Sequence, residues 1–198
     1  MRDERGELRR LVVPAAIGVV TLLLGSYFAF LTFRDVWVVP GTDKVAETPR
    51  VKTTRLVSRA GGFSLRVPKD MSVSRKGRAV LVSNHAKTLV VTVGPGEGGP
   101  LREATQRYLS TLEERYQESR LVDSRPQQVD GRHALTSYGQ AVNRRDAKLR
   151  FVALMVRAAP RNYTITAFTS FDSDPTVVLP RVQAVANGFR VLPPGSRR

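Results

Sequence analysis

The chain has 198 residues, with 32 Lys and Arg residues against 17 Asp and Glu residues, and its formal net charge is +15. It contains two histidines and no cysteine, which excludes disulfides, thiolate metal sites, thiol nucleophiles and a cysteine-linked lipid anchor. The residues that remain for catalysis near neutral pH are few.

Residues 11–33, LVVPAAIGVVTLLLGSYFAFLTF, contain no charged side chain over 23 positions. A helix of this length reaches about 34 Å, enough to cross a hydrocarbon core of about 30 Å. We therefore expect a single transmembrane helix, with the lipid bilayer as its partner. The alternative is a cleaved signal peptide, but this apolar core exceeds the usual length of about 7 to 15 residues and no Ala-x-Ala site follows it.

The flanking charges bear on orientation. Residues 1–10 end in Arg9 and Arg10, directly before the span, which favours a cytoplasmic leader and an extracytoplasmic carboxy-terminal domain. Four basic residues lie within twenty positions after the span, as many as lie before it, so the charge count alone leaves the orientation open. The expected location is the cell membrane.

Beyond the span, three segments are predicted. Residues 34–59 include Pro40, Gly41 and Pro49 without sustained periodicity, which predicts a flexible stalk. Residues 60–192 are enough for one domain, and residues 193–198 form a tail expected to be disordered.

The first part of the domain predicts strands. Residues 63–67 alternate apolar and polar side chains until Pro68, and residues 79–82 and 89–93 predict a hairpin. The two hairpin strands are apolar on both faces, so both faces are expected to be covered.

A helix is predicted from residue 100 to residue 119, because apolar side chains recur there at spacings of three and four. Three antiparallel strands should follow at 121–129, 133–142 and 147–158, with a turn at Asp130 and Gly131. Residues 162–171 predict a strand nearer an edge of the sheet. A last helix should begin after Asp174, its N-cap, and stop near Gly188.

This order predicts an α+β fold, an antiparallel sheet with helices packed on it. The opening GFSLRVP at residues 62–68, the turn at Asp130 and Gly131, the strand NYTIT at 162–166 and the closing helix resemble the PsbP superfamily. That superfamily includes the photosystem II extrinsic protein PsbP and actinobacterial LpqN-type surface lipoproteins. The resemblance covers about residues 60–192. It implies an α/β/α sandwich that serves as a binding or assembly module outside the cytoplasm, with no shared catalytic residues.

The residues that could take part in catalysis or hold a metal are few and scattered. We therefore expect a protein that is not an enzyme and that has neither a cofactor nor a metal. His85 lies in a predicted turn and His133 at the start of a predicted strand, each without a cluster of partners. No G-x-S-x-G motif occurs, and the glycine-rich residues 94–99 lack the G-K-[ST] of a phosphate loop. Asp172 and Asp174 are explained by helix capping rather than by calcium binding.

One basic cluster is a candidate for binding an anion or a protein partner. It comprises Arg144, Arg145, Lys148, Arg150 and Arg161, which are expected to gather at one end of the sheet. Phospholipid headgroups, cell-wall polyanions or an acidic protein are the expected ligands, whereas no nucleic-acid motif is present. The alternative is dispersed charge that aids solubility.

Three functions follow, in order of preference. The first is a membrane-anchored extracytoplasmic binding or scaffolding protein with an envelope or membrane protein as partner. The second is a sensor that binds an anionic surface, either lipid headgroups or a cell-wall polymer. The third is an envelope hydrolase with an unrecognised site, which the shortage of general bases disfavours.

Overall fold

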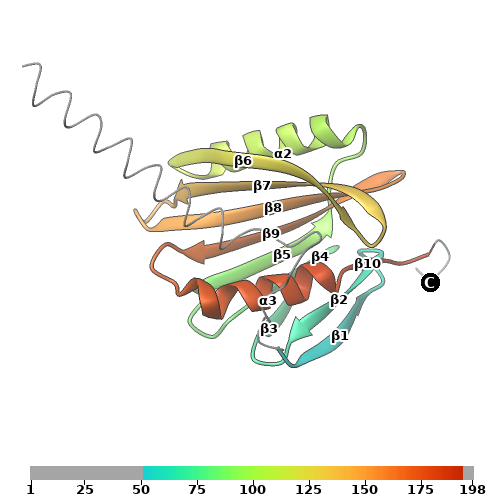
Figure 1. The fold of residues 1–198 in the computed structure, drawn as a ribbon, viewed down its shortest axis with the longest axis horizontal. Helices are drawn as coiled ribbons and strands as arrows, with labels where there is room; N and C mark the ends of the chain where they lie inside the picture. Colours follow the sequence, from blue (N-terminus) through green and yellow to red (C-terminus); the bar gives the residue numbers. More distant parts are fainter. Residues whose placement is uncertain (1–50, 194–198) are drawn as a thin grey trace, which may run out of the picture. The chain divides into compact units, whose positions relative to one another are not determined.

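The structure, a computed structural model, describes residues 51–193, which form two antiparallel sheets and two helices (Figure 1). The predicted span at 11–33, the leader, most of the predicted stalk and residues 194–198 lie outside the described residues. The elements in chain order are β1 (Thr53–Ser58), β2 (Phe63–Pro68), β3 (Ser72–Lys76), β4 (Ala79–Ser83), β5 (Leu89–Pro95), α2 (Leu101–Arg115), β6 (Glu118–Val129), β7 (Arg132–Val142), β8 (Lys148–Ala158), β9 (Arg161–Ser170), α3 (Pro175–Asn187) and β10 (Arg190–Val191).

The larger sheet has seven strands in the order β3-β4-β5-β9-β8-β7-β6, and every neighbouring pair is antiparallel. The predicted turn at Asp130 and Gly131 joins β6 to β7, and both residues have positive φ values, 54° and 67°. The chain thus adopts the antiparallel α+β architecture that the order of elements predicts.

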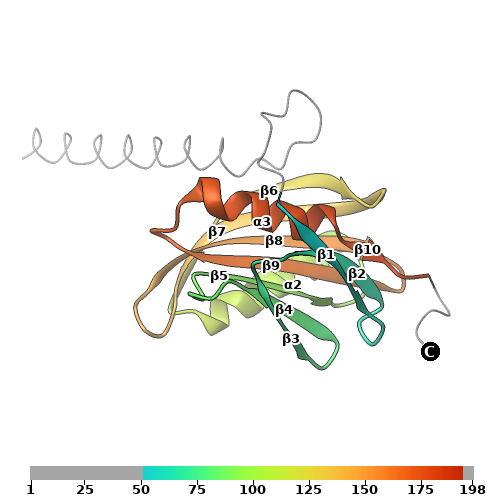
Figure 2. The ribbon, with the colours of Figure 1, turned by 90° about the horizontal axis from the view of Figure 1, so that it is seen from below.

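The two helices cover opposite faces of this sheet (Figure 2). Because strand side chains alternate, Phe151 and Ala153 of β8 face α2 and pack with its Leu112. On the other face lie α3 and the smaller sheet, whose strand order is β1-β2-β10. A helix layer, the large sheet and a mixed layer of α3 with the small sheet therefore form the sandwich.

Both described helices begin close to the residues predicted from the sequence, but α2 ends earlier than predicted. Asp174 caps α3 by accepting a hydrogen bond from the Thr176 backbone N–H at 2.9 Å. The helix predicted to reach residue 119 ends at Arg115, and Tyr116 has extended φ and ψ values of −108° and 152°. Its ring stacks on Phe168 at a centroid distance of 5.1 Å, and the next N–H, that of Gln117, donates to the Val142 carbonyl of β7 at 3.0 Å, so the backbone here already pairs with the sheet.

Three strands were not expected from the sequence, namely β1, β3 and the two-residue β10. β1 lies within the predicted stalk, where Leu56 stands opposite Leu65 of β2, so the last residues of that segment belong to the domain. All five residues of β3 are exposed, and such a polar edge strand carries no hydrophobic pattern.

Two expectations about the sheet are corrected. β9 is not near an edge but lies between β5 and β8, and its polar Thr166 is buried beneath α2. The hairpin of β4 and β5 is fully covered on one face only, and its other face is partly exposed. Val80 and Val82 are buried, whereas Leu81 on the other face is 37% exposed.

Neither described helix combines the length and the apolar character needed to cross a bilayer.

Two buried threonines of the sheet give a matched test of hydrogen bonding in the core. Thr136 and Thr166 are both fully buried, but the Thr166 hydroxyl bonds to Tyr108, whereas the described residues offer the Thr136 hydroxyl no partner. We expect Thr136→Val to raise the free energy of unfolding by about 1 kcal/mol and Thr166→Val to lower it by about 1 kcal/mol. Urea denaturation measures both values. Equal effects of the two substitutions would contradict this assignment.

Candidate functional site

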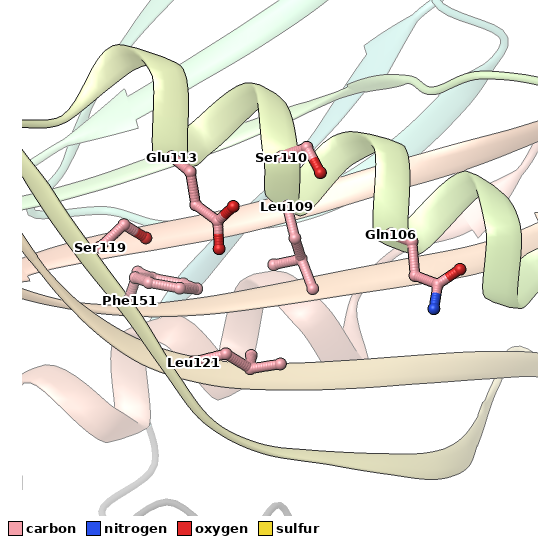
Figure 3. A pocket seen from close by; sticks show the side chains of 7 residues that line it. All are labelled: Gln106, Leu109, Ser110, Glu113, Ser119, Leu121 and Phe151. Carbon is pink, nitrogen blue, oxygen red and sulfur yellow. The ribbon is translucent and has the colours of Figure 1, made fainter.

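A pocket of about 330 Å³ opens between α2 and the edge strand β6 (Figure 3). Glu113 and Leu109 project from α2 toward β6 and Phe151. The pocket forms because one flank of α2 presents residues three and four positions apart, while Ser119 and Leu121 of β6 share a strand face. Its lining residues are Gln106, Leu109, Ser110, Glu113, Ser119, Leu121 and Phe151.

The chemistry of this α2–β6 pocket suits contact rather than proton transfer. Leu121 is 43% exposed, and the buried Phe151 forms the floor. Glu113 is the titratable group among the lining residues. Ser119 pairs with Ala141 of β7, and His133 lies eight residues from Ala141 on that strand, about 27 Å away. The pocket serines therefore do not form a nucleophile–base pair with this histidine.

The helix beside the pocket is fixed by a buried hydrogen bond. The hydroxyls of Tyr108 on α2 and Thr166 on β9 are 2.6 Å apart. Burial raises the pKa of Tyr108 above its ordinary value, and the bond to Thr166 only partly opposes this. The Tyr108 phenol therefore holds α2 on the sheet in its neutral form.

The raised pKa of Tyr108 predicts a loss of stability in alkali. A group whose pKa is higher in the folded state stabilises the fold below its unfolded pKa, here about 10, and the stabilisation falls as pH rises above that value. We expect the free energy of unfolding to fall above about pH 10 and to fall less in Tyr108→Phe. At neutral pH the substitution should cost about 1 kcal/mol. Urea denaturation at several pH values tests this, and identical pH profiles would refute it.

A second hollow, of about 460 Å³, lies between the turn after β1 and the turn after β3. We call it the hairpin cleft. Its lining residues are Val57, Ser58, Arg59, Ala60, Arg75 and Gly77. The two turns lie side by side in both views of the fold (Figures 1 and 2), and the Arg78 Nε donates to the Ala60 carbonyl at 3.3 Å.

The stretch of chain that supplies the hairpin cleft is strongly basic. Between residues 51 and 96 the basic residues are Lys52, Arg55, Arg59, Arg66, Lys69, Arg75, Lys76, Arg78 and Lys87. Asp70 is the single acidic residue of that stretch, and Arg181 binds it at 2.5 Å. This surface was not predicted from the sequence, although the scarcity of acidic residues over 46 positions indicated it.

The five basic residues predicted as a site are divided between the two ends of the sheet. Arg144 and Arg145 lie exposed in the turn before β8, and Lys148 begins that strand. Arg150 is half-buried and stacks over the Phe171 ring at 4.2 Å, where desolvation lowers its pKa. Arg161 pairs with Ala158, at the opposite end of β8. Four of the five thus share one end, and Arg161 lies at the end that carries the hairpin cleft.

The remaining candidates stay isolated. His85 lies exposed in the β4–β5 connection, and His133 is exposed at the start of β7. Over residues 51–193, no three His, Cys, Asp or Glu side chains gather as a metal site would require. Residues 94–99 are tied to the sheet, since Asn162 Nδ2 donates to the Glu97 and Gly99 carbonyls at 2.8 and 3.2 Å.

Comparison with known proteins identifies the fold. No protein-family model matches the chain, and no curated protein matches it in sequence. The solution structure of cyanobacterial PsbP from Synechocystis sp. PCC 6803 matches 75% of this chain and 98% of its own, with a TM-score of 0.56 and 15% identity. The crystal structure of LpqN, involved in cell envelope biogenesis of Mycobacterium tuberculosis, matches 77% of this chain and 100% of its own, with a TM-score of 0.49 and 10% identity. The described domain has a PsbP-like fold, as the sequence resemblance predicts.

Proposed function

We propose that this protein is a non-catalytic binding or scaffolding domain held at the outer side of a cell membrane by a helix at residues 11–33. The observation that supports binding is the form of its hollows. The α2–β6 pocket and the hairpin cleft are open surface depressions of about 330 and 460 Å³, lined by exposed apolar side chains beside polar or cationic ones. Such surfaces suit a macromolecular partner.

The α2–β6 pocket is the proposed site for a protein partner. Leu121 and Leu109 supply apolar contact, and Phe151 lies beneath them. A rim with Gln106 and Glu113 offers hydrogen bonds at the edge of that contact, which is the arrangement of a small protein interface.

A second candidate function, binding to an anionic surface, is favoured by the hairpin cleft. Arg59 and Arg75 lie at the hollow and make no ion pair within residues 51–193. Unpaired arginines are free to bind phosphate or carboxylate groups in a bidentate manner.

The membrane anchor is tested on the full chain by carbonate extraction. We expect the chain to stay with the membrane pellet, because the 23 apolar residues at 11–33 contain no charge. Leu22→Arg combined with Leu24→Arg should release it, since each central arginine costs about 2.5 to 3.5 kcal/mol on insertion. Protease added to intact cells should digest the carboxy-terminal domain. Quantitative recovery of the wild-type chain in the soluble fraction would refute the anchor.

The protein-binding surface is tested by site-specific photocrosslinking in cells. A benzoylphenylalanine at Ser110, which lines the α2–β6 pocket, should give crosslinked adducts with a partner protein. The same probe at Glu114, exposed on the same helix one turn further but outside the pocket lining, is the matched control. Adducts of equal yield at both positions, or at neither, would count against the pocket as the binding surface.

A further inference from the structure

We propose that the hairpin cleft docks this corner of the domain on a bilayer by binding the phosphate groups of anionic phospholipids. The proposal deepens the proposed function, since the bilayer is the one that residues 11–33 would cross. It commits to a lipid surface, and a nucleic acid or a soluble phosphate is an outcome of the test.

The hairpin cleft carries positive charge that no described carboxylate pairs with. Arg59 and Arg75 line the hollow, and Lys76 and Arg78 flank it on the β3–β4 turn. All four side chains are exposed, and none makes an ion pair with another described residue. Four cations that make no ion pair repel each other, and an anion between them relieves that repulsion.

The cleft is also preorganised, because contacts within the protein hold its two turns against each other. Arg78 donates to the Ala60 carbonyl at 3.3 Å, and the Gly61 N–H donates to the buried Ser58 hydroxyl at 3.2 Å. A Cβ on Gly61 would lie 2.7 Å from the Arg78 carbonyl oxygen and 2.3 Å from the Phe63 ring. The arginines of the cleft therefore start from a backbone fixed by close contact, which lowers the entropy lost on binding.

Exposed apolar side chains at the cleft favour a lipid surface over a soluble polyanion as the ligand. Val57 lines the cleft and is 39% exposed. Val73 is 42% exposed. It lies two residues before Arg75 in β3 and therefore on the same face of that strand. At a bilayer surface, arginines can contact the phosphate groups while neighbouring apolar side chains contact the upper part of the acyl chains. Stacking aromatic side chains, the usual feature of single-stranded nucleic-acid surfaces, are absent from the cleft lining.

The other end of the sheet supplies a matched control. Arg144 and Arg145 are also exposed, but their turn contains Asp146 as well, and Asp172 acts on the nearby Arg150. Removing two charges there changes the net charge as much as removing two from the cleft. The two double variants therefore separate a local site from a general effect of net charge.

The experiment uses the full chain held in phosphatidylcholine nanodiscs and titrated with separate vesicles. Vesicles of phosphatidylcholine with about 30% phosphatidylglycerol should bind it in low salt, and vesicles of phosphatidylcholine alone should not. The double variant Arg59→Gln with Arg75→Gln should weaken binding by about 25-fold, about fivefold for each arginine. Arg144→Gln with Arg145→Gln should change it by less than about twofold. Thermal unfolding of each variant shows that it remains folded.

Hydrogen exchange gives the location. Peptides covering residues 53–62 and 72–80 should gain protection when the phosphatidylglycerol vesicles are added, and the peptide covering residues 143–147 should not. Equal loss of binding in both double variants, or protection at 143–147 alone, would overturn the proposal. Tighter binding to inorganic phosphate or single-stranded DNA than to the vesicles would overturn the lipid assignment.

This experiment distinguishes failure of the proposed membrane anchor from failure of the proposed lipid-binding cleft. A chain without a membrane helix would elute apart from the nanodiscs on size exclusion, and its vesicle titration would still test the cleft. A chain that enters nanodiscs but ignores phosphatidylglycerol would retain the anchor and refute the cleft.

Discussion

The structure depends on three aromatic rings that join its separate layers. Phe63 of β2, Tyr163 of β9 and Phe189 after α3 are 5.5 to 6.0 Å apart between ring centroids, and all are almost fully buried. The Tyr163 hydroxyl also donates to the Gly62 carbonyl at 3.2 Å. One cluster thus fixes the small sheet on the large sheet and ends α3. It also places the turn that contains Arg59 and Gly62, so the hairpin cleft is an extension of the core.

The sequence predicted those elements whose burial follows a regular period. Both helices and the strands β2 and β4 to β9 carry that signal, and the fold class and the PsbP resemblance follow from their order. β3 has no buried side chain and so left no pattern. β9 resembled an edge strand because it is rich in threonine, but Thr166 is buried through its bond to Tyr108. That bond joins residues 58 apart in sequence, beyond the reach of periodicity.

The candidate site was harder to predict because charge clusters in space do not follow clusters in sequence. Arg144, Arg145, Lys148 and Arg150 are close in sequence and do share one end of the sheet. Arg161 was grouped with them, but an antiparallel strand of eleven residues carries the chain about 35 Å away before the turn that leads to it. The hairpin cleft unites residues near 59 and 77, and their proximity follows only from the packing of the small sheet on the large one.

The two ends of the sheet differ in how their carboxylates are used. At the end that carries the cleft, Asp130 pairs with Arg190 at 3.3 Å, and Glu97 pairs with Arg107 at 2.5 Å. These carboxylates are already neutralised by arginines of their own, so they do not offset Arg59 and Arg75. At the other end, Asp172 acts on Arg150, whose guanidinium also stacks on Phe171. Asp146 and Asp172 thus lie beside the cations of that end, whereas the carboxylates at the cleft end are paired with other arginines, and this difference supports the cleft as the proposed surface for an anionic partner.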